Sequence, residues 1–166
     1  MGIFNKAKAF VGGKGMADVA ITVIERQPAE RATFPVTDSV IKGTMVITAR
    51  QACTLLATRY ELYLRMPGES GNEVDQFVTS AQDPAPNTHY GDSCLKLPCD
   101  LSPGQVITQP WLVMDVDLVK AFKSRGYPSV DKVIDNARIK FVVKCIADMK
   151  GSPFDPSAEV VVRLVR

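Results

Sequence analysis

The sequence predicts an all-β protein, an antiparallel sandwich with a short helix at the N-terminus and one short helix inserted late in the chain. Apolar and polar residues alternate over long segments, which is the period of a strand with one buried face. Gly and Pro separate these segments at short intervals. Helical periodicity is confined to brief stretches, so strands follow strands, as in a sandwich, rather than alternating with helices.

The clearest strand lies in the stretch ARIKFVVKCIADMKG, residues 137–151. One face carries Ile139, Phe141, Val143, Cys145 and Ala147. The other face carries Arg138, Lys140, Val142, Lys144, Ile146 and Asp148. We therefore expect a half-buried strand. The following segment, SPFDPS, contains two prolines and should end this strand. The last segment, SAEVVVRLVR, predicts a final strand that pairs with the strand in 137–151 across a long loop.

Earlier strands are predicted in residues 18–27, 39–50 and 53–66, with a short edge piece at 31–36, where Pro35 has no amide to donate. In the third of these we expect one buried face, which consists of Leu56, Thr58, Tyr60, Leu62 and Leu64. Further extended segments are predicted at 76–81, 93–97 and 106–119. Residues 117–126 predict a brief helix that ends at Gly126.

The N-terminal residues 1–16 form an amphipathic segment, followed by a single domain over 17–166. Apolar residues recur at helical spacing in this segment, namely Ile3, Phe4, Ala7, Phe10 and Val11. Docking on the domain, peripheral membrane contact through residues 1–13 and partner contact all remain open interpretations. Lys6 stands where a myristoylation motif needs Ser or Thr, so that modification is disfavoured.

Composition excludes several classes of protein. The 166 residues are 46% hydrophobic and 23% charged, as in a soluble globular domain. The net charge is +2, and basic and acidic residues are interspersed along the chain without a basic stripe. We therefore expect no nucleic acid as a partner. No apolar run is long enough to span a bilayer, and the N-terminus lacks the pattern of a secretory signal. We expect a cytoplasmic protein.

The four cysteines are expected to be reduced thiols. A disulfide between Cys94 and Cys99 and a zinc site with His89 are both conceivable from the spacing. A structural zinc ion usually takes four protein ligands, however, and Cys53 and Cys145 lie far away within predicted strands. We therefore expect no metal and no cofactor.

One short motif resembles the GDSL block of a hydrolase family, in Gly91–Leu95. The single histidine, His89, precedes Ser93, whereas that family needs a later Asp-x-x-His to activate its serine. We expect no catalytic residues and no enzyme. The alternative is a small ligand-binding, metal-binding or hydrolytic sandwich with a pocket near His89, Ser93 and Trp111.

Three stretches together resemble the N-terminal domain of arrestin-like proteins, an immunoglobulin-like β-sandwich: TFPVTDSVIKGTMVITARQACTLLATRYELYLRM, CLKLPCDLSPGQ and ARIKFVVKCIADMKG. Within this group, the sequence most resembles the bacterial sporulation-control arrestin-like proteins, which also have an amphipathic start, a Trp that corresponds to Trp111, and a run similar to MDVDLVKAF. The resemblance covers residues 17–166. A classical arrestin has two such sandwiches and only one fits here, and no phosphate-sensing charge cluster is assigned.

The resemblance implies a non-catalytic adaptor that binds a protein partner through a sheet edge and loops. From the strands and the N-terminal segment we expect the contact residues to be Phe4, Phe10, Val19, Ile21 and Phe34. Homo-oligomer formation, most simply a homodimer, is a further expectation, because a single sandwich leaves sheet edges free.

Overall fold

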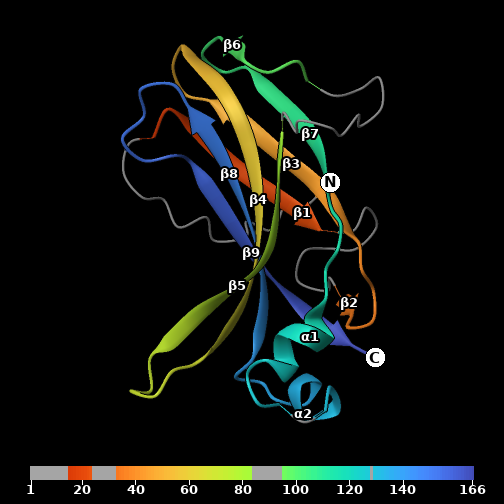
Figure 1. Ribbon diagram of the computed structural model, residues 1–166. Helices are drawn as coiled ribbons and strands as arrows, with labels where there is room; N and C mark the ends of the chain where they lie inside the picture. The colour runs from red at the N-terminus through yellow and green to blue at the C-terminus, as the bar shows by residue number, and fades with distance from the viewer. Residues whose placement is uncertain (1–14, 24–32, 84–94, 128) are drawn as a thin grey trace, which may run out of the picture.

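The computed structural model describes residues 15–23, 33–83, 95–127 and 129–166 (Figure 1). Within these ranges there are nine strands and two short helices. The strands form two sheets that pack face to face around one hydrophobic core. The all-β sandwich predicted from the sequence is confirmed. Phe4 and Phe10 lie outside the described residues, as does the rest of the predicted N-terminal helix.

The smaller sheet has three antiparallel strands in the order β1–β3–β7, with bounds Ala17–Val23, Ile41–Ala49 and Val106–Val113. The larger sheet has the order β2–β9–β8–β4–β5, with bounds Thr33–Pro35, Ser157–Val165, Lys140–Met149, Cys53–Pro67 and Glu73–Asp83. β6 (Cys99–Leu101) pairs with the start of β4. The short edge strand β2 runs parallel to β9, whereas the other described pairs are antiparallel.

β8 confirms the predicted inward face and corrects the other one. The five residues expected inside are all buried. Val142 and Ile146 on the opposite face are also buried, at 1% and 7% exposure, so this strand is not half-buried. β8 lies between β4 and β9 in the larger sheet, and side chains of both neighbours cover its outer face.

The predicted buried face of β4 is right from Thr58 to Leu64 and wrong at Leu56. The register with β8 shifts between Leu55 and Ala57, which marks a bulge. Leu55 is therefore fully buried and Leu56 is 37% exposed. A bulge inserts one residue, so strict alternation assigns the wrong face on one side of it.

The predicted helix is present as α1 (Leu118–Lys123), where the Asp117 carboxylate accepts a hydrogen bond from the Lys120 amide at 2.8 Å. A second helix, α2 (Asp131–Ile134), was not predicted, because one turn of helix has no readable periodicity. Figure 1 shows both helices at the end of the sandwich opposite β6. No helix among the described residues is long and apolar enough to cross a membrane.

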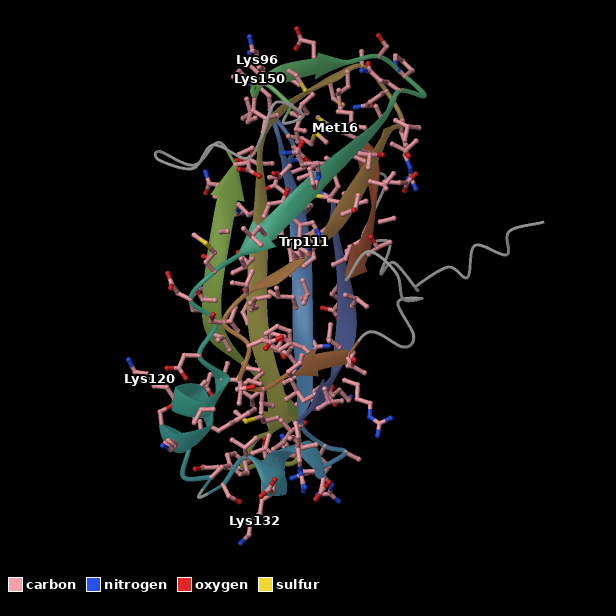
Figure 2. All side chains as sticks on the ribbon, turned by 90° about the vertical axis from the view of Figure 1, so that its right-hand side faces the viewer. Met16, Lys96, Trp111, Lys120, Lys132 and Lys150 are labelled. Atoms are coloured by element: carbon pink, nitrogen blue, oxygen red, sulfur yellow. The ribbon has the colours of Figure 1, made fainter. Side chains whose placement is uncertain are left out.

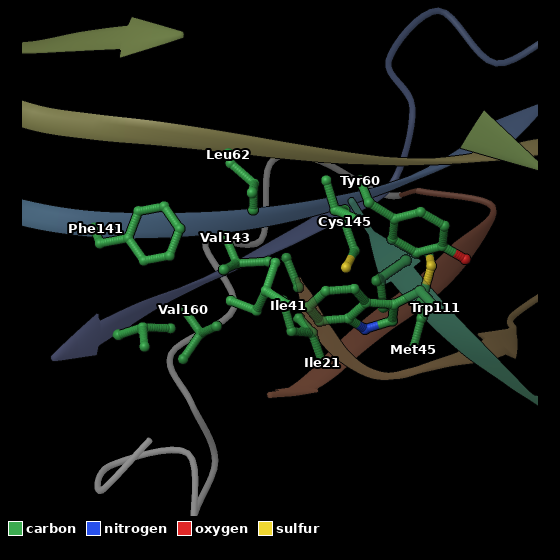
Figure 3. Packing of buried hydrophobic residues seen from close by; sticks show 14 of the residues in the cluster. Ile21, Ile41, Met45, Tyr60, Leu62, Trp111, Phe141, Val143, Cys145 and Val160 are labelled. Atoms are coloured by element: carbon green, nitrogen blue, oxygen red, sulfur yellow. The ribbon is translucent and has the colours of Figure 1, made fainter. Parts of the chain in front are cut away.

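Trp111 joins the two sheets at the centre of the core. Its indole lies 5.6 Å from the ring of Tyr60, centroid to centroid, with 20° between the planes (Figure 3). Trp111 belongs to β7 and Tyr60 to β4, so this contact crosses from the smaller sheet to the larger. Gly43 of β3 is the register partner of Trp111, and the indole occupies the space beside this glycine.

We predict that Gly43→Ala destabilises the protein by about 1–3 kcal/mol or more, the usual cost of overpacking a core. A Cβ atom at Gly43 would lie 2.0 Å from the Thr22 carbonyl oxygen and 2.5 Å from Cζ2 of Trp111, so backbone or indole must move. Urea unfolding measures the effect. Gly68→Ala is the control, since its Cβ would meet the exposed Val74 side chain at 2.7 Å, at the surface rather than in the core. Equal losses in both variants would contradict the prediction.

Candidate interaction surface

Three of the residues expected to contact a partner have their side chains in the core. Val19 and Ile21 of β1 are each 6% exposed, and Phe34 of β2 is 2% exposed. The Phe34 ring lies 5.4 Å from that of Phe141. A partner therefore cannot contact these three side chains in the folded domain. Binding at β1 and β2 stays a prediction about strand edges, and these side chains serve the fold.

The alternative pocket near His89, Ser93 and Trp111 has two members outside the described residues. The third, Trp111, is 2% exposed and packs on Tyr60 within the core. Its indole therefore contributes to joining the sheets, and a pocket between these three residues stays an untested prediction.

The outer face of the larger sheet carries a continuous row of apolar side chains. Strand register places Tyr63 of β4 opposite Phe77 of β5 on one side and opposite Val142 of β8 on the other, and Val142 opposite Val161 of β9. We call Phe77, Tyr63, Val142 and Val161 the outer row. Its two ends are open, since Phe77 is 55% and Val161 46% exposed. Isolated exposed apolar residues are common, whereas contiguous exposed apolar surface often marks an interaction site, so the outer row is a candidate docking surface.

The aromatic end of the outer row is held in a fixed geometry. The Tyr63 and Phe77 rings meet edge to face with centroids 5.9 Å apart. The Tyr63 hydroxyl donates a hydrogen bond to Oε2 of Glu61 at 2.5 Å. Burial, together with this bond, raises the pKa of Tyr63 to about 12. The phenol is therefore neutral at physiological pH, and its ring orientation is fixed.

An ion-pair network borders the outer row. Arg65 donates to both oxygens of Asp75 at 2.7 and 2.8 Å and to Glu159 at 2.9 Å, which ties β4 to β5 and β9. The hydrogen bonds that Arg65 donates to Asp75 and Glu159 raise the pKa of Arg65, and the guanidinium lowers the pKa of Asp75. Lys140 pairs with Glu73 at 2.5 Å further along the same border. These pairs fix the side chains around the row.

β5 is the last strand of the larger sheet on this side, and among the described residues it pairs with β4 alone. We call its side that faces away from β4 the β5 edge. Its C-terminal end is tied to the smaller sheet by a hydrogen bond between the side chains of Asp83 and Gln109 of β7. Burial raises the pKa of Asp83, and this hydrogen bond partly offsets the rise. Gln109 is 1% exposed. The opposite end, from Glu73, is exposed along its first residues and projects with the β4–β5 turn (Figure 1).

Neither the outer row nor the β5 edge was predicted from the sequence. The segment 76–81 was expected to be a strand, but it gives no sign of which strands lie beside it. Phe77 and Val161 are 84 residues apart in the chain. They lie in one row because β4 and β8 stand between their strands in the sheet. Alternation predicts the face of each residue, and the order of the strands decides the row.

We predict that Asp75→Asn lowers stability above the ordinary Asp pKa of 3.8 and that the difference from the natural protein shrinks below it. The pKa of Asp75 is lowered in the folded state, so its ionised form stabilises the fold, and this contribution is lost as pH falls through the lowered pKa. Urea unfolding between about pH 2 and 7 measures the effect. A difference that is constant over this range would show that Asp75 acts through packing instead.

No protein-family profile and no curated protein sequence matches the chain. Among solved structures, the chain is similar to Spo0M, a sporulation control protein from Bacillus subtilis, with a TM-score of 0.57 and 13% sequence identity. The likeness covers 92% of this chain and 50% of that one, so the chain spans about half the length of the structure it matches. Spo0M has an arrestin-like fold, which confirms the arrestin-like sandwich expected from the sequence.

Proposed function

We propose that the chain is a non-catalytic protein-interaction module of the arrestin-like type, an adaptor that binds an extended segment of a partner protein along the β5 edge. The observation that carries this proposal is the coincidence of an exposed edge strand with the open end of the outer row at Phe77. The fold similarity to a sporulation control protein supports a regulatory module in general terms.

Strand addition suits this edge because a terminal strand offers unpaired amide and carbonyl groups. An added strand would bring every second side chain onto the outer face, beside Phe77. One apolar partner residue there would extend the outer row and remove the Phe77 ring from water. Backbone hydrogen bonds would then supply affinity, and the Phe77 contact would supply specificity.

The acidic composition of β5 disfavours a second copy of the chain as the partner. Glu73, Asp75 and Asp83 are acidic, and the strand has no Lys or Arg. With Val78 opposite its own copy, the two acids Glu73 and Asp83 would face each other, and no register of two β5 strands gives an opposite-charge pair. Directly opposed like charges destabilise a sheet. Homodimer formation therefore stays a prediction for other surfaces.

A bulge shapes the stretch that the partner can use. The β4–β5 register shifts where Leu62 pairs with Thr79 and Tyr63 with Phe77, which leaves Val78 unpaired. Bulges at sheet edges limit uncontrolled strand pairing. We place the partner segment along residues 73–77, on the exposed side of this bulge. We place the module in the cytoplasm, where the reduced cysteines of the described residues would persist.

The test compares the natural protein with Phe77→Lys and Val106→Lys as baits for capture from cells of its source. Both residues are exposed on terminal strands, at 55% and 59%, but Val106 lies on β7 of the smaller sheet, away from the outer row. We expect Phe77→Lys to weaken partner binding roughly tenfold or more, as for a hot-spot aromatic. Val106→Lys should bind as the natural protein does.

Capture alone does not decide the proposal, so the partner is purified and the complex reconstituted. Amide hydrogen exchange should then show new protection in residues 73–77. Protection confined to β1 or β2 would move the site to the strands that the sequence first suggested. Equal loss in the Phe77 and Val106 variants would overturn the β5 edge as the site.

A further inference from the structure

Two free thiols lie on the same face of neighbouring strands at the β6 end of the sandwich. In the β4–β6 pair, Cys53 is opposite Leu101 and Leu55 is opposite Cys99. Cys53 and Cys99 are therefore diagonal neighbours that share a face with two buried leucines. On the other face, the Thr54 hydroxyl donates to the Asp100 carboxylate at 2.7 Å, which fixes this register.

The two thiols are near each other and open to solvent. Cys53 and Cys99 are each partly exposed, whereas Cys145 is fully buried in the core. Burial raises the pKa of the Cys99 thiol, with smaller contributions from Asp100 and from Cys53 itself. Burial raises the pKa of the Cys53 thiol as well.

The diagonal spacing suits a bridging metal better than a disulfide. Diagonal Cα atoms in an antiparallel pair are about 7–8 Å apart. A disulfide needs a Cα separation below about 6.8 Å, so these thiols would have to draw the strands together. Two sulfurs on one metal ion at about 2.3 Å each can stand up to about 4.6 Å apart, against about 2.05 Å in a disulfide, so a metal bridge accommodates the longer Cα separation.

Two methionines, Met149 and Met16, also lie at this end of the sandwich. Met149 of β8 is directly opposite Leu55, across β4 from Cys99. Met16 packs against the same core, and its carbonyl accepts a hydrogen bond from the Arg50 amide, just before Cys53. Figure 2 shows Met16 at the same end as Lys150, the neighbour of Met149 in sequence. Thiolates and thioethers select soft ions such as Cu(I).

We propose that Cys53 and Cys99 form a binding site for one soft, thiophilic metal ion, Cu(I) in particular. Cu(I) accepts two sulfur ligands in a nearly linear arrangement, which two side chains on neighbouring strands can supply. Two thiols and one Cu(I) ion give a bis-thiolate complex and release two protons to the solvent. The oxidation state of copper does not change. Among the described residues, no three His, Cys, Asp or Glu side chains gather closely enough to offer a richer site for a harder ion.

The bridge would fasten β6 to β4. β6 has only three residues, and β4 is its described pairing partner. A metal between Cys53 and Cys99 would add a second fixed point beside the Thr54–Asp100 hydrogen bond. We therefore expect Cu(I) to raise the melting temperature of the natural protein and to leave that of a Cys53→Ser variant unchanged.

The test is an anaerobic Cu(I) titration of the full chain against the chromophoric chelator bicinchoninate. We expect the natural protein to withdraw one Cu(I) per chain. Cys53→Ser and Cys99→Ser should each weaken apparent affinity by roughly 100-fold or more, since loss of even a supporting group around a metal costs 10–100-fold. Cys145→Ala is the matched control and should bind as the natural protein does. Circular dichroism verifies that each variant is folded.

Cys94→Ser separates this site from the pairing suggested by sequence spacing, Cys94 with Cys99. If Cys94→Ser abolishes binding while Cys53→Ser retains it, the assignment to Cys53 and Cys99 is overturned. Cu(I) uptake that is the same in the natural protein and in a Cys53→Ser/Cys99→Ser double variant would also overturn it. Neither outcome bears on partner binding at residues 73–77 of the β5 edge, which pair with the far end of β4, at residues 63–67, whereas β6 pairs with residues 53–55.

Discussion

The contact between Trp111 and Tyr60 is the constraint on which the sandwich depends. It joins the smaller sheet to the larger one at the centre of the core, and the indole fits there because Gly43 has no side chain. Holding β7 against β4 also sets the position of β5, whose end is tied to β7 through Asp83 and Gln109. β5 is thus tied to the smaller sheet at one end, and its other end, from Glu73, is exposed.

Exposed apolar side chains on the outer face of the larger sheet are the chemical basis of the proposed binding site. The ends of the outer row, Phe77 and Val161, remain in water although the strands between them are well packed. Folding does not require that exposure, whereas strand addition would use it. The fold alone does not specify a partner, because one architecture supports many functions. The match to half of a longer structure therefore informs the architecture, and the edge of β5 informs the binding mode.

Local sequence patterns predicted several features that depend on residues close together in the chain, although not the short helix α2. The alternation from Ile139 to Ala147 predicted the inward face of β8, which is fully buried. Asp117 and Gly126 marked the two ends of the α1 region. Pro35 predicted an edge position for β2, which is correct because proline has no amide to donate into a central ladder.

Strand order, register and bulges were decided only by the tertiary structure, because they depend on contacts between distant segments. The bulge beside Leu55 turned Leu56 outward against the alternation. Packing between the sheets placed the side chain of Phe34 inside, where the sequence had suggested a contact surface. The outer row needs four strands in one order, and the Cys53–Cys99 pair needs one register. The sequence by itself therefore determined the strands and their faces, and long-range pairing determined which faces and edges are free to bind.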